Sequence, residues 1–397
     1  MRRVAARTPN LTFPLCRLLN CPLLFLLLTT VGCSSSGSAP PHVPQFTTID
    51  PPAPATLGGQ GFFAVGMASN GIIAGYYFDS GGGTHGYLRE LDGTATIIDA
   101  PDAFQGVGGR TTVLAANSSG TTVGNYLGSD GNLHAFSRSA TGQYSLLPGL
   151  SYYYFGQNGF PTQASTSVLF PTAINDSGIV AGYFYDPNVG VHSFIVPNQG
   201  PYDGQPLNTG GPGSGSASGH GFGSWIQYVS PTGDTVGFYR NDQSGLHGFI
   251  HHYLDGTVTV VDAPGYSGTD TAGTIVNWIG SDGTVVGSVF TSQVLHSFVR
   301  TPDGKYTIFD PPSAGLMWSA AYSANAAGVI AGNFTDAESI RHGYLRNSDG
   351  TFTIIDDPNG SQIPNLAGTD ITGFNDAGTI VGIYQDAEGI GHAYIRQ

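Results

Sequence analysis

Short apolar segments of about five residues, separated by polar turns rich in Gly, Asp and Ser, follow one another from residue 46 to the end of the chain. The stretch 111–148 is representative. It predicts four short strands, at 111–116, 121–126, 133–137 and 143–147. No ten-residue amphipathic helical pattern occurs after residue 32. The pattern of apolar and polar positions therefore predicts an all-β fold.

These strands belong to a sequence repeat that occurs seven times. In each copy a turn glycine is followed four residues later by a second glycine, and nine or ten residues further on by a histidine. The turn glycines are Gly71, Gly120, Gly178, Gly233, Gly283, Gly328 and Gly378, and the second glycines are Gly75, Gly124, Gly182, Gly237, Gly287, Gly332 and Gly382. Four antiparallel strands in about 50 residues are typical of a propeller blade, so the repeat predicts a seven-bladed β-propeller of four-stranded antiparallel blades.

The two ends of the chain complement each other. The last repeat stops after its third strand, at 392–395, whereas Phe46–Pro52 (FTTIDPP) is similar to Tyr306–Pro312 (YTIFDPP), the fourth strand of an earlier repeat. We therefore expect the N-terminal strand to join the last blade and close the ring, which also covers two exposed strand edges. An open β-solenoid is the alternative, but it gives no reason to divide one repeat between the termini.

The N-terminal segment 1–32 has the pattern of an export signal. Its only charges are four Arg, and its apolar run, Leu18–Val31, is too short and too interrupted to span a membrane. With Cys33 behind it, this segment resembles a bacterial lipoprotein signal, which implies cleavage before Cys33 and a lipid on its thiol. An ordinary secretory signal is the alternative. We expect a flexible tether at 33–44 and the propeller at 45–397.

Cysteine usage and charge narrow the possible partners. Cys16 and Cys21 lie in the signal segment, so the mature chain keeps Cys33 alone and has no intrachain disulfide. Without the four Arg of the signal, nine Lys and Arg stand against 27 Asp and Glu, a net charge of −18. Such a surface repels nucleic acid and anionic membranes. We expect a monomer at the cell envelope or cell surface that contacts the membrane only through its lipid.

The residues around the repeated histidines are similar to those of a known repeat family. The triplet His134-Ala135-Phe136 has variants in the other repeats: His85-Gly86-Tyr87, His192-Ser193-Phe194, His247-Gly248-Phe249, His296-Ser297-Phe298, His342-Gly343-Tyr344 and His392-Ala393-Tyr394. The chain thereby resembles the HAF-repeat family of extracellular bacterial proteins over nearly all of its mature length. The resemblance implies an exported repeat protein and supplies no catalytic residues.

Most repeated histidines have an aspartate partner at the end of the fourth strand. Hairpins folded at the intervening turns bring together His85 and Asp99, His247 and Asp262, His296 and Asp310, and His342 and Asp356, while Asp50 from the N-terminal strand would reach His392. We expect these pairs to be structural pins. A metal site is the alternative, because Asp79, Asp186, Asp242, Asp336 and Asp386 precede their histidines in loops. One carboxylate per loop is too few for calcium, so no metal or cofactor is predicted.

Aromatic residues gather in the connections between repeats, on one expected face of the propeller. The candidates are Tyr152, Tyr153, Tyr154 and Phe155 in the insertion 148–172, Tyr202 and His220 in the insertion 198–224, and Trp318. Aromatic rings on a polar surface of low charge suit the stacking of sugar rings. Simple packing of the insertions is the alternative.

Sequence motifs of enzymes are absent. The chain has no H-E-x-x-H, G-x-S-x-G or S-x-x-K motif, and no catalytic residue is predicted. The sequence favours a non-enzymatic binding or scaffold module for a glycan or protein partner. The alternative is a carbohydrate-active enzyme, a glycoside hydrolase or lyase, that uses acidic residues on the insertion-bearing face.

Overall fold

The chain divides into two compact units, Met1–Val43 and Pro44–Gln397. The computed structural model describes residues 44–49, 57–104, 109–147, 151–155, 161–165, 168–186, 190–196, 206–207, 223–241, 245–265, 273–291, 294–312, 318–364 and 368–397. All regular secondary structure in these ranges is β-strand, which confirms the predicted all-β class. They contain no helix long and apolar enough to cross a membrane.

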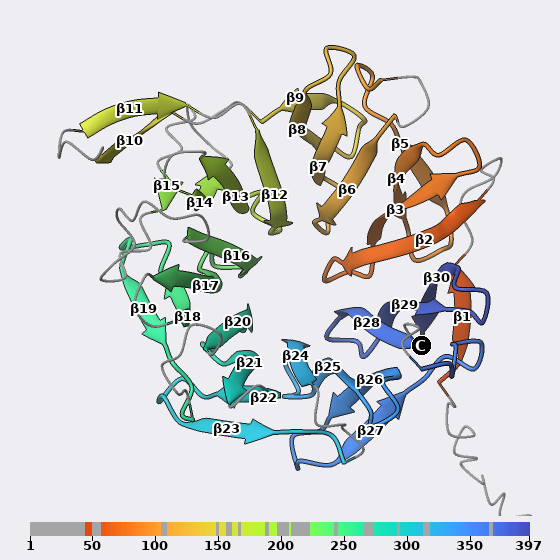
Figure 1. Ribbon diagram of the computed structural model, residues 1–397, viewed down its shortest axis with the longest axis vertical. Helices are drawn as coiled ribbons and strands as arrows, with labels where there is room; N and C mark the ends of the chain where they lie inside the picture. Colours follow the sequence, from red (N-terminus) through yellow and green to blue (C-terminus); the bar gives the residue numbers. More distant parts are fainter. Residues whose placement is uncertain are drawn as a thin grey trace, which may run out of the picture. The chain divides into compact units, whose positions relative to one another are not determined.

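Three sheets have four antiparallel strands each (Figure 1). The first contains β2 (Leu57–Met67), β3 (Ile73–Asp79), β4 (Thr84–Arg89) and β5 (Ala95–Ile98). The second contains β6 (Thr111–Ala116), β7 (Thr122–Leu127), β8 (Leu133–Arg138) and β9 (Tyr144–Leu146). The third combines the two ends of the chain, with β28 (Thr369–Phe374), β29 (Ile380–Gln385), β30 (Gly391–Arg396) and β1 (Phe46–Ile49).

Two larger sheets of eight strands each consist of two four-stranded groups. One contains β12 (Leu169–Ile174), β13 (Val180–Asp186), β14 (Gly190–Val196), β15 (Pro206–Leu207), β16 (Gly223–Val229), β17 (Thr235–Asn241), β18 (Gly245–His251) and β19 (Val258–Val261). The other contains β20 (Thr274–Ile279), β21 (Val285–Thr291), β22 (Val294–Arg300), β23 (Tyr306–Phe309), β24 (Trp318–Ala324), β25 (Ile330–Thr335), β26 (Arg341–Arg346) and β27 (Phe352–Ile355). A single parallel residue pair joins the groups in each, Val191 with Gly223 and Leu295 with Trp318. The hairpin of β10 (Ser151–Phe155) and β11 (Pro161–Ser165) stands apart.

The N-terminal strand β1 pairs antiparallel with β30, from Phe46 opposite Arg396 to Ile49 opposite Ala393 (Figure 1). The ring of Phe46 lies 5.4 Å from that of Tyr394, and the Arg396 guanidinium lies 5.7 Å from the Phe46 ring. Thr48 Oγ1 and the Tyr384 hydroxyl are 3.1 Å apart. The segment before the first repeat therefore supplies the fourth strand of the last repeat's sheet.

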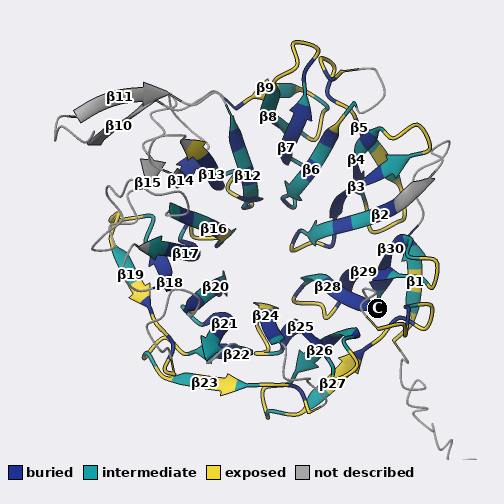
Figure 2. Cartoon of the chain, viewed as in Figure 1, coloured by how far each residue is buried: buried dark blue, intermediate teal, exposed yellow. Residues whose placement is uncertain are grey.

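Hydrophobic clusters hold neighbouring sheets together face to face. One cluster joins Ile98 of the first sheet to Val113 and Phe136 of the second, and another joins Phe62 of the first sheet to Val381 and Ile395 of the third. The first strands of successive groups, β2, β6, β12, β16, β20, β24 and β28, contact one another in this order, and β28 also contacts β2. Figure 2 shows exposed residues in the turns and, among the strands, in outer ones such as β19 and β27. The arrangement is propeller-like.

Every first strand carries a β-bulge at the same place, where its register against the second strand shifts by one residue. In β2 the shift lies between Ala64 and Gly66, so Val65 has no partner in β3. The repeated second glycine faces each bulge. A Cβ on Gly75 would lie 2.0 Å from the Phe63 carbonyl oxygen, so the close approach of the two strands at the bulge requires glycine there.

Candidate functional site

The repeated histidines lie beside their predicted aspartates in four repeats. In each pair the imidazole Nδ1 lies within hydrogen-bonding distance of a carboxylate oxygen. The distances are 2.9 Å for His85 and Asp99, 3.0 Å for His247 and Asp262, 2.6 Å for His296 and Asp310, and 2.7 Å for His342 and Asp356. Asp50, the predicted partner of His392, lies outside the described residues. The imidazoles bridge the third and fourth strands, and their role as structural pins stays a prediction.

A second carboxylate, from the end of the second strand or the loop that follows it, faces the other ring nitrogen. Nε2 lies 3.1 Å from Asp79 in His85, 3.1 Å from Asp336 in His342 and 3.0 Å from Asp386 in His392. The hydrogen bonds with Asp356 and Asp336 outweigh burial and raise the pKa of His342. Asp79 also accepts hydrogen bonds from the backbone N–H groups of Gly81 and Gly83. These contacts fasten a loop to a strand.

The metal alternative would draw its ligands from the loop aspartates, of which Asp79, Asp336 and Asp386 lie in the part of the chain that the structure describes. No group of three or more His, Cys, Asp or Glu side chains there is arranged to hold a metal ion. The side chains of Asp186 and Asp242 lie outside that part. The sequence pattern predicted the contact of each histidine with the aspartate at the end of the fourth strand. It did not predict that the loop aspartate contacts the other nitrogen of the same imidazole.

The aromatic residues predicted on the insertions lie largely beyond the described residues. Tyr152, Tyr153, Tyr154 and Phe155 form β10, whose side chains are not described, and Tyr202 and His220 fall in undescribed segments. Trp318 begins β24, where the Arg341 guanidinium lies 5.7 Å from its ring. The described residues thus bring together no site around these aromatic residues.

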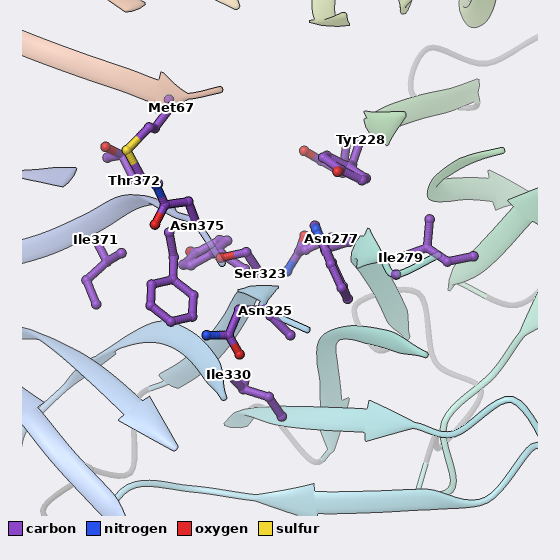
Figure 3. A pocket seen from close by; sticks show the side chains of 18 of the residues that line it. Met67, Tyr228, Asn277, Ile279, Ser323, Asn325, Ile330, Ile371, Thr372 and Asn375 are labelled. Atoms are coloured by element: carbon purple, nitrogen blue, oxygen red, sulfur yellow. The ribbon is translucent and has the colours of Figure 1, made fainter. Parts of the chain in front are cut away.

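A different candidate lies where the first strands meet. A cavity of about 920 Å³ is lined by the second halves of these strands and the turns that follow them (Figure 3). The unpaired residue of every bulge lines it: Val65, Leu114, Thr172, Gln227, Asn277, Tyr322 and Thr372. The residue before each of them is buried, whereas the bulge residue is at least partly exposed. The bulge therefore redirects one side chain per repeat into the cavity.

The chemistry of the bulge residues changes around the cavity. Val65 and Leu114 are apolar, whereas Gln227 and Asn277 carry amides and are followed directly by the cavity-lining rings of Tyr228 and Trp278. These two rings are 6.1 Å apart. Figure 3 shows Tyr228 across the pocket from Met67 and Thr372. One side of the cavity is thus apolar, and another combines aromatic and amide groups.

Sequence reasoning missed these residues although a signal for them exists. Each bulge residue stands ten positions before the second glycine of its repeat. The glycine is constant and the position ten residues earlier takes the types Val, Leu, Thr, Gln, Asn, Tyr and Thr. A variable position at fixed spacing from constant ones indicates a side chain that the fold does not determine.

Two of the bulge side chains also connect neighbouring first strands. Thr172 Oγ1 donates to the Ile226 carbonyl oxygen at 3.0 Å, and Asn277 Nδ2 donates to the Ala321 carbonyl oxygen at 2.8 Å. In both cases the acceptor directly precedes the next bulge residue. Thr372 occupies the same position, but its hydroxyl has no partner within the described ranges.

Tyr322, Arg341 and Asp370 belong to the cavity lining and lie close to one another. Arg341 Nη2 pairs with Asp370 Oδ2, and Asp370 is only 3 % exposed. Burial raises the pKa of Asp370, an effect that Arg341 opposes. Burial and the nearby charge of Asp370 raise the pKa of Tyr322 to about 12, so its phenol stays neutral at physiological pH.

Comparisons with solved structures relate the fold to known proteins. A prolyl endopeptidase structure matches with a TM-score of 0.51 and 10 % identity, covering 80 % of this chain and 45 % of the other. An oligogalacturonate lyase from Vibrio parahaemolyticus (TM-score 0.49, 12 % identity, 90 % and 97 % coverage) and the six-bladed β-propeller lectin of Aleuria aurantia (0.39, 14 %, 78 % and 98 %) are also similar.

These similarities extend to the fold alone. The chain spans less than half the length of the prolyl endopeptidase that it matches. No family model matches the chain, and no curated protein does. The protein is an all-β protein of β-propeller-like fold.

Proposed function

We propose that the protein is a closed seven-bladed β-propeller that acts as a non-enzymatic binding module, with the central cavity as its site. The seven repeats, the contacts of the first strands from β2 through to β28 and back to β2, and the pairing of β1 with β30 support the closed ring. The variable bulge position carries the binding proposal. Seven otherwise similar repeats each place one side chain in the same cavity, and six residue types occur at these seven positions.

The ligand that fits this wall is a small neutral polar molecule, and a short glycan is the best candidate. Tyr228 and Trp278 offer ring faces on which the C–H face of a sugar packs, and Gln227 offers an amide for its hydroxyls. A protein partner on the insertion-bearing face is the other candidate. Export, membership of the HAF-repeat family and lipid attachment at Cys33 complete the proposal, and they place this module at the cell envelope.

Binding to the cavity can be tested with the chain from Ser34 onward. We expect neutral oligosaccharides to raise its melting temperature, because a ligand at 100 times its Kd adds about 2.7 kcal/mol. W278A should weaken binding at least tenfold by calorimetry, since it removes an aromatic face of the cavity. W225A is the matched control, because Trp225 stacks on Phe238 at 5.0 Å outside the cavity lining. Equal loss in both variants would contradict the proposed site.

One observation favours the enzymatic alternative. Asp370 is a carboxyl group in the cavity wall whose pKa burial raises, as a general acid requires. Glycoside hydrolysis commonly needs a second carboxylate about 5–10 Å away. If the protein is an enzyme, one of the oligosaccharides should be converted to product, and D370N should abolish this turnover.

A further inference from the structure

The wall of the cavity is divided into two arcs of different chemistry. The first strands follow one another around it in the order β2, β6, β12, β16, β20, β24 and β28, and β28 contacts β2 again. In this order their bulge residues are Val65, Leu114, Thr172, Gln227, Asn277, Tyr322 and Thr372. Val65 and Leu114 are therefore neighbours and form an apolar arc, and the three neighbours Gln227, Asn277 and Tyr322 form a polar arc. One threonine separates the two arcs on each side.

The residue that follows each bulge residue divides the wall in the same way. It is large and aromatic only in β16 and β20, where Tyr228 and Trp278 line the cavity beside the polar arc. Beside the apolar arc it is Gly66 or Ala115, which also line the cavity. A Cβ on Gly66 would have no atom within 4 Å. The apolar arc thus leaves open space where the polar arc carries aromatic rings.

The apolar arc does not belong to the core of the protein. Val113, directly before Leu114, is fully buried in the cluster that joins the first two sheets. Val65 and Leu114 are partly exposed and belong to none of the hydrophobic clusters that the described residues form. Met67 also lines the cavity on this side, and Figure 3 shows it across the pocket from Tyr228. Apolar side chains that line a cavity without being packed in the core can contact an apolar group of a ligand.

We infer that the ligand is amphiphilic, a sugar that bears a hydrocarbon substituent, with the sugar at Tyr228 and Trp278 and the hydrocarbon against Val65 and Leu114. This rests on the proposed binding function and specifies what the opposite side of the cavity binds. A volume of about 920 Å³ lies near the upper end of the range of about 300–1,000 Å³ for ligand pockets, so one sugar ring leaves most of it unfilled.

The apolar arc distinguishes a hydrocarbon from a second sugar. The side chains of Val65 and Leu114 offer no hydrogen bond, so sugar hydroxyls placed against them would lose their bonds to water without replacement. A hydrocarbon loses nothing there, and each CH₂ group that becomes fully buried tightens binding about fourfold.

The test lengthens the hydrocarbon on a constant sugar. The chain from Ser34 onward is titrated calorimetrically with the methyl, butyl, hexyl and octyl β-glycosides of glucose, galactose and mannose, below the concentrations at which they form micelles. We expect at least one methyl glycoside to bind, and the octyl glycoside of the same sugar to bind at least tenfold more tightly. W278A should weaken all four chain lengths by a similar factor, because they share the sugar.

L114N and V65T test the position of the hydrocarbon. The fold accepts both residue types at the bulge, since Asn277 and Thr372 occupy it in other repeats. L114N should reduce the ratio of octyl to methyl affinity at least fivefold, and V65T should reduce it less. L146N is the matched control and should keep the wild-type ratio, because Leu146 belongs to the same repeat as Leu114 but is 59 % exposed on β9, outside the cavity lining.

The outcomes distinguish this inference from the proposed function. An octyl glycoside that binds no more tightly than the methyl glycoside would overturn the amphiphilic ligand and leave the binding function standing. The same ratio in the wild type, L114N and V65T would overturn it as well, because the hydrocarbon would then lie elsewhere. If the melting temperature shows that L114N fails to fold, V65T remains decisive. No binding of any glycoside to the wild type would overturn both the glycan-binding function and the amphiphilic ligand.

Discussion

At the scale of single residues, the second glycine of the repeat is required for a steric reason. The second glycine of each repeat lies against a carbonyl oxygen of the bulged first strand. A Cβ would approach that oxygen to 2.0 Å at Gly75, 1.9 Å at Gly237 and 2.1 Å at Gly287. The glycine is therefore required by the bulge, because the extra residue brings the backbone of the first strand close to the second strand.

This pairing predicts a sharp contrast between two neighbouring glycines. G75A should lower the free energy of unfolding by about 2 kcal/mol or more, since the added methyl group forces the backbone of β2 or β3 to shift. Gly66 lies in the same sheet, but a Cβ there would have no atom within 4 Å. G66A should therefore stay within about 0.5 kcal/mol of the wild type in urea unfolding. Equal effects would show that the bulge does not require glycine.

The hydrogen bonds of His342 with two aspartates predict how the stability of the protein depends on pH. The hydrogen bond with Asp356, helped by that with Asp336, raises the pKa of His342 above its unfolded value despite burial. The protonated form is thus favoured in the folded state, and its stabilisation is complete below pH ~6.5 and disappears as the pH rises through the higher folded value. We expect the free energy of unfolding to fall from mildly acidic to mildly basic pH.

D356N identifies the source of this pH dependence. It removes the main cause of the raised pKa of His342, so the fall in stability between about pH 6 and 8 should become shallower. Urea unfolding at several pH values in that interval gives both slopes. The same slope in wild type and D356N would mean that the His342–Asp356 contact makes no contribution through protonation.

At the scale of elements, the apolar pattern predicted strands well and the bulges not at all. The strands expected at 111–116, 121–126, 133–137 and 143–147 correspond to β6, β7, β8 and β9 within a residue or two at each end. Alternation with a period of two identifies a strand, but a bulge inserts one residue without changing composition. Leu114 reads as an ordinary apolar strand residue, although it faces the cavity.

The candidate site was predictable only where local sequence determines it. A hairpin of fixed length brings His85 to Asp99, so the spacing of the two residues was sufficient. The ion pair in the cavity wall combines Arg341 of β26 with Asp370 of β28, and the cavity combines residues from all seven first strands. No spacing within one repeat encodes which residues of different repeats converge. That information lies in how the sheets pack.

At the scale of the whole molecule, the pairing of β1 with β30 makes the last sheet depend on the segment before the first repeat. Removing residues 44–52 from the chain that starts at Ser34 should lower its melting temperature and expose the edge of β30. Free strand edges pair with other chains, so the variant should also form oligomers in light scattering. Ile49, 4 % exposed in the core between the first and last sheets, adds to the loss.

The control for this deletion removes only residues 34–43, which belong to the other compact unit and not to β1. That variant should keep the melting temperature and the monomeric mass of the parent chain. Comparing the two deletions separates the effect of losing β1 from the effect of shortening the N-terminal segment. A deletion of 44–52 that stays monomeric with an unchanged melting temperature would remove the main support for the closed ring, because β30 would then need no partner at its outer edge. A clear loss would show that the chain is held together through its own ends, with the cavity enclosed as a consequence.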